Sequence, residues 1–219
     1  MISTATSYYG TKSQEYFSGA RADFVERLPA NQKASILEIG CSSGGTGALA
    51  LSEGKCIEYT GIDLVPDIVE QAKNKLTKVI LTDLENEFPD LEPEQFDALI
   101  ASEIFEHLRD PWAVLEKLVP LLKPGAMVLA SSPNISHNSV LKDLRKGHFN
   151  YKDMGIMDRT HLRWFTPNSY KALFTEAGLV VTDMWPFRPI KIQQKIIAKF
   201  LPNGQKTFWR QICIEAKKP

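Results

Sequence analysis

The chain has 219 residues, a formal net charge of zero, 43% hydrophobic residues and 24% charged residues. This length suits one domain, and the balance of apolar and charged residues excludes a disordered or fibrous chain. A neutral total charge speaks against a broad basic surface, so we expect no nucleic-acid partner.

The three cysteines, Cys41, Cys56 and Cys213, lie far apart and lack the CxxC spacing of a zinc site or redox motif. Unpaired cysteines are typical of a reducing compartment. The N-terminal residues contain no apolar stretch like that of a signal peptide, and no apolar run is long enough to span a bilayer. We therefore expect a cytoplasmic chain with no stable membrane insertion.

Strand and helix patterns alternate along the first part of the chain. Residues 12–29 have apolar side chains at helical spacing. Five short apolar runs then have the pattern of buried strands, at 35–39, 59–62, 78–81, 96–101 and 126–130. Helical patterns lie between them at 44–51, 66–76 and 111–122. This alternation predicts a parallel sheet with helices on both faces, in which ligands bind beyond the C-terminal ends of the strands.

The alternation of strand and helix patterns stops after Ser132. Residues 133–165 are polar and irregular, and a connection of this length inside a compact domain is usually functional. Thr166 and Pro167 then begin a helix that Gly178 ends. Two late strands follow at 180–185 and 210–216, with residues 186–204 inserted between them.

A glycine-rich turn follows the first predicted strand, in the sequence LEIGCSSGGTG that begins at Leu37. Glycines at a strand-to-helix turn let a ligand approach the backbone, and the helix N-terminus offers unpaired N–H groups. The dinucleotide fingerprint GxGxxG, aligned on Gly40, would need glycine where Ser42 stands. Glu38 suits a cationic amino group better than a pyrophosphate. The alternative interpretation is a helix start with incidental glycines.

Acidic residues follow the second and third predicted strands. Asp63 stands where an acidic residue binds ribose hydroxyls in nucleotide-binding sheets, although a helix N-cap is the other interpretation. Asp83 can accept a hydrogen bond from an exocyclic amino group such as that of adenine, although an Asp after a strand is common in turns.

Residues 35–132 resemble the class I S-adenosylmethionine-dependent methyltransferases. The segments that carry the resemblance are LEIGCSSGG, YTGIDLVPDIVEQAK, TDLE, FDALIASEIFEHLRDP and LLKPGAMVLASSPN. The resemblance implies an α/β fold, a Rossmann-like doubly wound sheet of seven strands that is mostly parallel with the last strand antiparallel. It also implies S-adenosylmethionine as the cofactor and S-adenosylhomocysteine as its product.

The same resemblance implies which residues hold the cofactor. Glu38 and the loop from Gly40 to Gly44 would hold the methionine end, and Asp63 the ribose. Asp83 and Leu84 would flank the adenine. The full set implied is Glu38, Gly40, Cys41, Ser42, Gly44, Asp63, Leu64, Asp83, Leu84, Ser102 and Glu103. Ser42 departs from the family, which often has glycine there, and we expect this small residue to be tolerated.

The stretch from Asp158 to Thr166, DRTHLRWFT, carries a narrower resemblance. It is similar to methyltransferases encoded with bacterial surface-polysaccharide genes. This implies a sugar or glycan precursor as the acceptor and a role in polysaccharide biosynthesis.

A hydroxyl acceptor must lose a proton, and histidine is the usual general base. His107 follows the fourth predicted strand and His161 lies in the long polar region, so we expect one of them to be the base, oriented by Asp158 or Glu103. Each histidine also has a structural interpretation, as a cap, a packing residue or a partner of the loop backbone. His137 and His148 are expected to be exposed. We expect no metal site, because no carboxylate and histidine cluster stands at ligand spacing.

We expect one domain over residues 1–219. Its parts are an N-terminal helical cap (1–30), a cofactor-binding core (31–132), a substrate and lid region (133–177) and a C-terminal strand pair with a helical insert (178–219). The cap carries an aromatic and basic group that either covers the cofactor or packs in the core: Tyr8, Tyr9, Tyr16 and Arg21.

Two other groups of residues have open interpretations. The segment 189–201 alternates Ile with Lys, and we interpret it as an amphipathic cap on the sheet, with a membrane surface or a homodimer contact as alternatives. A basic group in the polar region either binds an anionic or sugar substrate or forms a solvated face: Arg145, Lys146, Arg159 and Arg163.

The sequence therefore predicts an enzyme that transfers a methyl group from S-adenosylmethionine to a small-molecule or glycan acceptor, at a hydroxyl oxygen. The alternatives are methylation of nitrogen or carbon, a nicotinamide-dependent oxidoreductase, and a non-catalytic partner protein that binds S-adenosylmethionine. The partner that we expect is the small-molecule or sugar substrate, and the sequence leaves a homodimer open.

Overall fold

The computed structural model describes residues 19–201 and 203–219. Seven strands form one sheet in the order β3-β2-β1-β4-β5-β7-β6. The strands are β1 (Ser35–Ile39), β2 (Glu58–Asp63), β3 (Lys78–Leu81), β4 (Phe96–Ser102), β5 (Leu122–Pro133), β6 (Val180–Pro186) and β7 (Gln211–Lys217). All pairs are parallel except those of β7, which runs antiparallel to both β5 and β6. This confirms the predicted seven-stranded sheet with its last strand antiparallel.

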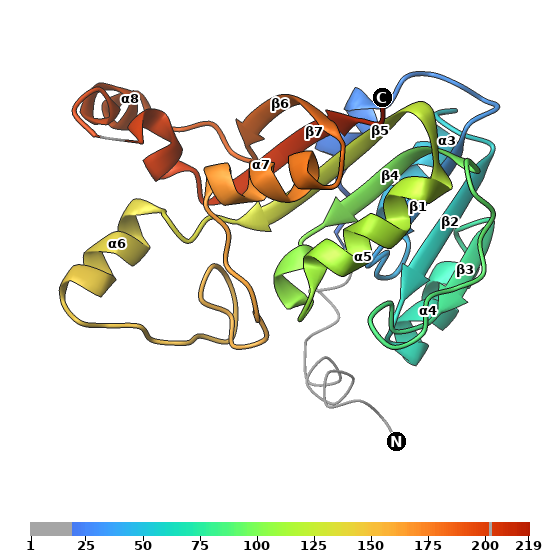
Figure 1. The fold of residues 1–219 in the computed structure, drawn as a ribbon, viewed down its shortest axis with the longest axis horizontal. Helices are drawn as coiled ribbons and strands as arrows, with labels where there is room; N and C mark the ends of the chain where they lie inside the picture. Colours follow the sequence, from blue (N-terminus) through green and yellow to red (C-terminus); the bar gives the residue numbers. More distant parts are fainter. Residues whose placement is uncertain (1–18, 202) are drawn as a thin grey trace.

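Helices cover both faces of the sheet (Figure 1). The α-helices in the described residues are α2 (Ala22–Arg27), α3 (Gly45–Ser52), α4 (Pro66–Lys73), α5 (Pro111–Leu118), α6 (Asn138–Arg145), α7 (Pro167–Glu176) and α8 (Ile192–Ala198), of which α6 and α8 lie apart from the faces of the sheet. Side chains of α5 and α7 share one buried cluster with the strands. Side chains of α2, α3 and α4 share a second cluster with the strands. The strands are nearly continuous apolar runs because both of their faces are buried in this way.

The polar region predicted as irregular contains a helix, α6, which the sequence analysis missed. Only Val140 is buried in this helix, so its sequence carries too short an apolar stripe to stand out. The His137 side chain caps its N-terminus by accepting a hydrogen bond from the Ser139 N–H. His137 is therefore half-buried rather than exposed, whereas His148 is exposed as expected.

The segment interpreted as a cap on the sheet is not one. In α8 only Ala198 is buried, while Ile192, Ile196 and Ile197 are exposed. The helix lies beyond the end of the sheet (Figure 1) and packs against the 3₁₀-helix η4 (Gly204–Phe208). Within the described residues, none of the helices has both the length and the apolarity that crossing a bilayer requires.

Candidate active site

A cleft of about 1190 Å³ lies beyond the C-terminal ends of β1, β2 and β4. Its walls come from the turns after these strands, from the region 133–165 and from the segment that precedes α8. This is the edge where open parallel sheets bind ligands. All but one of the predicted site residues line it, and the exception is Gly44.

The glycine-rich turn after β1 depends on left-handed backbone at three positions. Gly40 has φ 67°, Ser42 φ 49° and Gly44 φ 79°. Gly44 is the N-cap of α3, so it shapes the turn behind the cleft. The positive φ at Ser42 explains why glycine is common there, and serine is a strained occupant of this conformation. The Ser42 N–H donates to Asp63 Oδ2 at 2.9 Å, which ties the turn to the end of β2.

Glu38, in β1, is a buried carboxyl group at the floor of the cleft, with only 2% of its surface exposed. Its Oε2 accepts a hydrogen bond from the Tyr59 hydroxyl at 2.9 Å. Burial raises the pKa of Glu38 to about 8, although hydrogen bonds from Tyr59 and Thr46 oppose the shift. Such a group is stabilised as a carboxylate when a cation enters the cleft.

Asp63 ends β2 and does not serve as the N-cap of α4, since that position is Val65. Its two oxygens accept the N–H groups of Ser42 and Val65, at 2.9 and 3.1 Å. Burial raises its pKa, and these backbone bonds oppose the shift. Each carboxylate oxygen has further lone pairs that can accept hydroxyl protons.

The wall after β3 is formed by Asp83 and Leu84. Asp83 accepts hydrogen bonds from the Glu85 N–H and the Asn86 side chain, at 3.1 and 2.7 Å. Leu84 is buried, and it lines the cleft together with Leu64 after β2. An apolar slot with a carboxylate at its edge can receive a flat base such as adenine.

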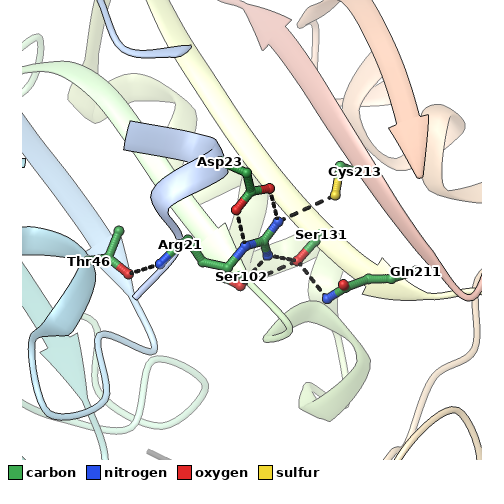
Figure 2. Close-up of polar contacts among 7 residues, drawn as sticks. All are labelled: Arg21, Asp23, Thr46, Ser102, Ser131, Gln211 and Cys213. Atoms are coloured by element: carbon green, nitrogen blue, oxygen red, sulfur yellow. Dashed lines mark hydrogen bonds and ion pairs between the residues drawn. The ribbon is translucent and has the colours of Figure 1, made fainter. Parts of the chain in front are cut away.

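Arg21, just before α2, lines the cleft. Figure 2 shows its side chain between Asp23 and the hydroxyl groups of Ser102 and Ser131. One of its nitrogens donates to the hydroxyl groups of Ser102 in β4 and Ser131 in β5, each at 2.6 Å. The other side of the guanidinium binds both oxygens of Asp23, each at 2.8 Å. Arg21 belongs to the aromatic and basic group predicted from the sequence, whose other members, Tyr8, Tyr9 and Tyr16, lie outside the described residues. Its long-range role in joining two strands had no local signal.

Glu103 directly follows β4 and has φ 53°. Such a backbone conformation is uncommon for residues with a side chain, and it concentrates at functional sites. Burial raises the pKa of Glu103, against hydrogen bonds from Gln211 and Ser131. The strained turn directs the next residues into the short helix η2 (Phe105–His107).

The outer half of the cleft is assembled from two segments far apart in the sequence. Glu106 and His107 belong to η2, and His161 belongs to the polar region after β5. The rings of His107 and His161 meet edge to face, with their centroids 4.8 Å apart. One ligand atom from each of Glu106, His107 and His161 lies within 4.8 Å of the others. The expectation that no carboxylate and histidine cluster stands at ligand spacing is therefore wrong.

Backbone hydrogen bonds attach the polar region to η2. The Leu162 and Arg163 N–H groups donate to the Glu106 carbonyl at 2.8 and 3.0 Å. Asp158 is buried, and its Oδ1 accepts the Thr160 N–H and hydroxyl at 2.9 and 2.8 Å. Asp158 therefore shapes the turn that presents His161, and its expected role in orienting a histidine base stays a prediction.

The four basic residues of the polar region do not act together. Arg159 lines the cleft, whereas Arg145 and Lys146 lie exposed at the end of α6. Arg163 donates a hydrogen bond to the Arg109 carbonyl. Of this group, only Arg159 remains placed to meet a substrate.

The chain matches known methyltransferases in sequence and in fold. The profile of a family described as "Methyltransferase domain" matches residues 13–183. The chain belongs to this methyltransferase family. A "Ubiquinone biosynthesis O-methyltransferase" from Xylella fastidiosa (strain M23) is 28% identical over 179 residues, which cover 75% of this chain and 68% of that protein.

Solved structures share the fold. An S-adenosylmethionine-dependent methyltransferase from Archaeoglobus fulgidus superposes with a TM-score of 0.62 at 21% identity, covering 94% of this chain and 97% of that one. One from Mesorhizobium loti gives a TM-score of 0.64 at 14% identity, covering 94% and 100%. The chain is thus a Rossmann-like methyltransferase whose cofactor is S-adenosylmethionine. The narrower resemblance to surface-polysaccharide enzymes finds no counterpart in the curated relative named above, which is a ubiquinone-biosynthesis protein.

The cofactor half of the cleft fits S-adenosylmethionine chemically. The buried Glu38 carboxyl suits the amino group, Asp63 suits the ribose hydroxyls, and Leu64 with Leu84 suits the adenine. The glycine turn leaves the backbone open to the ligand between these groups.

Proposed function

We propose that this enzyme transfers the methyl group of S-adenosylmethionine to a hydroxyl oxygen of a small-molecule or sugar-containing acceptor. The observation that carries the proposal is the Glu106, His107 and His161 cluster in the outer half of the cleft that holds the cofactor residues. Attack by nitrogen or carbon needs no such cluster, whereas a hydroxyl must lose its proton.

In this mechanism the acceptor oxygen forms a bond to the methyl carbon while the carbon–sulfur bond breaks and its electron pair stays on sulfur. The hydroxyl proton passes to His107 or His161. Glu106 and Asp158 are buried, and both line the same cleft. Burial raises the pKa of Glu106, and a protonated imidazole beside it would favour its carboxylate form. Residues of the region 133–165 line the outer half of the cleft, so they can align the acceptor and exclude water.

The acceptor class has two sources of support. The DRTHLRWFT stretch supports a sugar or glycan precursor, with Arg159 placed for an anionic group. The name of the Xylella relative supports O-methylation of an intermediate of ubiquinone biosynthesis. We propose a hydroxylated small molecule as the common class, and we propose a reducing, cytoplasmic location, which the three free and buried cysteines support.

The test combines cofactor binding with methyl transfer by the purified full chain. Calorimetric titration measures the affinity for S-adenosylmethionine. Incubation with two panels, nucleotide-linked sugars and dihydroxybenzoates, followed by quantification of S-adenosylhomocysteine and by NMR of the product, identifies the acceptor atom.

A methyl–oxygen product from either panel supports the proposal and selects the acceptor class. A product methylated at nitrogen or carbon would replace it with the alternative chemistry. A third incubation contains the small molecules of a cell extract. If the chain binds S-adenosylmethionine tightly but methylates no compound in any of the three incubations, it is a non-catalytic binding protein.

A further inference from the structure

Glu106, His107 and His161 form a group with the composition of a metal site. Their ligand atoms lie within 4.8 Å of one another, and all three residues line the cleft. Two imidazoles and one carboxylate are a ligand set that first-row divalent cations bind, often with an open position for substrate or water.

Backbone contacts favour one tautomer in both histidines, with Nε2 as the nitrogen that can bind a metal. His107 Nδ1 lies 3.2 Å from the Thr160 carbonyl oxygen, and His161 Nδ1 lies 3.1 Å from the Ile156 carbonyl oxygen. A carbonyl oxygen only accepts, so each Nδ1 carries the proton and each Nε2 carries the lone pair. Metal-binding histidines commonly donate their second nitrogen to a backbone carbonyl in this way, which fixes the ring orientation.

Glu106 supplies the carboxyl ligand. It is 1% exposed, and its Oε2 accepts a hydrogen bond from the Ser132 hydroxyl at 3.1 Å. Its Oε1 is buried and has no hydrogen-bond partner among the described residues. Buried polar atoms are normally satisfied, so an unpartnered carboxylate oxygen beside two imidazoles calls for a further ligand.

We propose that Glu106, His107 and His161 bind one first-row divalent cation at the acceptor end of the cleft. Zinc should bind more tightly than manganese, and imidazole ligands disfavour magnesium. The binding itself stands apart from the proposed function. The role that we assign to the cation, polarising the acceptor hydroxyl and lowering its pKa, rests on the proposed O-methylation. The two histidines then hold the cation instead of acting as the base, and the hydroxyl proton leaves to water.

The cation would also join two parts of the chain. Glu106 and His107 lie on η2 at the end of β4, whereas His161 lies on the polar region after β5. Binding to the folded state alone stabilises a protein by mass action, so the cation should raise the melting temperature and protect residues 148–162 from hydrogen exchange.

The experiment starts with the full chain freed of metal by a chelator. Zinc is titrated by calorimetry, and cobalt by its visible absorption, which reports nitrogen and oxygen ligands directly. We expect one cation per chain, and a loss of affinity of at least tenfold in His107→Ala, His161→Ala and Glu106→Gln. His137→Ala is the matched control, because His137 lines the same cleft but bonds Ser139 instead of the cluster.

Equal affinity in the wild type and in all three cluster variants would overturn the site, as would no binding or an equal loss in His137→Ala. Each variant is first shown to bind S-adenosylmethionine, so that a misfolded variant is not counted. If zinc binds as expected but methyl transfer is unchanged by the chelator, the polarising role is overturned while the site stands. If zinc binding depends on the cluster but no acceptor is methylated at oxygen, the proposed O-methylation is wrong and the metal site stands.

Discussion

The two halves of the cleft are built in different ways. In the half that we assign to the cofactor, Gly40, Ser42 and Asp63 lie at the ends of adjacent parallel strands, and a hydrogen bond from the Ser42 N–H to Asp63 joins two of these ends. In the outer half, which we assign to the acceptor and call the acceptor half, η2 and His161 meet because the region after β5 folds back onto η2. The first half follows from strand order alone, whereas the second depends on a long connection. We therefore expect substitutions in the two halves to affect different steps.

We expect the largest difference between the effect on kcat and the effect on cofactor affinity in His161→Ala. Removing a proton acceptor or a cation ligand should lower kcat by roughly 100-fold to 10,000-fold. The affinity for S-adenosylmethionine should stay within about twofold, because His161 is in the acceptor half. Steady-state kinetics and calorimetry check the two values. His137→Ala, with nearly unchanged kcat, is the control, and a loss of cofactor affinity in His161→Ala would contradict the division of the cleft.

Asp63→Ala should have the converse effect. Hydrogen bonds from hydroxyls to a charged group contribute about 1.5–3 kcal/mol each, so the affinity for S-adenosylmethionine should fall by about 10-fold to 100-fold or more. The variant also loses the anchor of the Ser42 N–H, which adds to the effect. Calorimetric titration measures the change.

Asp67→Ala is the matched control for Asp63, because Asp67 is an exposed carboxylate in the first turn of α4. Unchanged affinity in this control and in Asp63→Ala alike would show that the ribose is held elsewhere.

The same contrast explains how much the sequence could predict. The strands β1 and β3 were predicted at their observed bounds, since each is a short apolar run bounded by polar or turn residues. Glu38 in β1 and Asp63 at the end of β2 both line the cleft, because the carboxyl ends of parallel strands converge at one edge of the sheet. The hydrogen bonds from Arg21 to Ser102 and Ser131 join three segments that are distant in the sequence, and no local sequence pattern predicts such contacts.

In the acceptor half too, contacts between distant residues could not be predicted from the sequence. His107 and His161 were each proposed as a base, but their contact was not foreseen. Glu106 was not predicted as a site residue, because a charged residue next to a histidine in a short helix is usually exposed. In the structure it is buried and accepts a hydrogen bond from Ser132. Residue types were therefore informative, and the pairing of distant residues was not.

The pH dependence of cofactor binding tests the cofactor half further. The pKa of Glu38 is about 8, so its carboxyl is largely protonated at pH 7 without the cofactor. A cationic amino group binds the carboxylate, so binding must release this proton. Affinity should therefore rise with pH from 6 to 7.5, by up to about tenfold per unit.

Calorimetry at pH 7 in buffers of different ionisation enthalpy should show close to one proton released per bound cofactor. Glu38→Gln should bind more weakly and release none. A pH-independent affinity in the wild type would mean that Glu38 does not meet the amino group. Asp63 and Arg21 also act on Glu38, in opposite directions, so their variants should shift the profile rather than abolish it.

We expect the smallest effect outside the cleft, in α8, which was predicted to cap the sheet but does not. A helix that capped the sheet would bury its isoleucines, and losing one would cost about 2–5 kcal/mol. Ile196 is instead 58% exposed, so Ile196→Ser should change the free energy of unfolding by no more than about 0.5 kcal/mol. Urea unfolding measures this, with Ile100→Ser in the buried centre of β4 as the contrast that should lose several kcal/mol. A large loss in Ile196→Ser would mean that another surface covers α8 in solution, and a concentration-dependent midpoint would then identify that surface as a second copy of the chain.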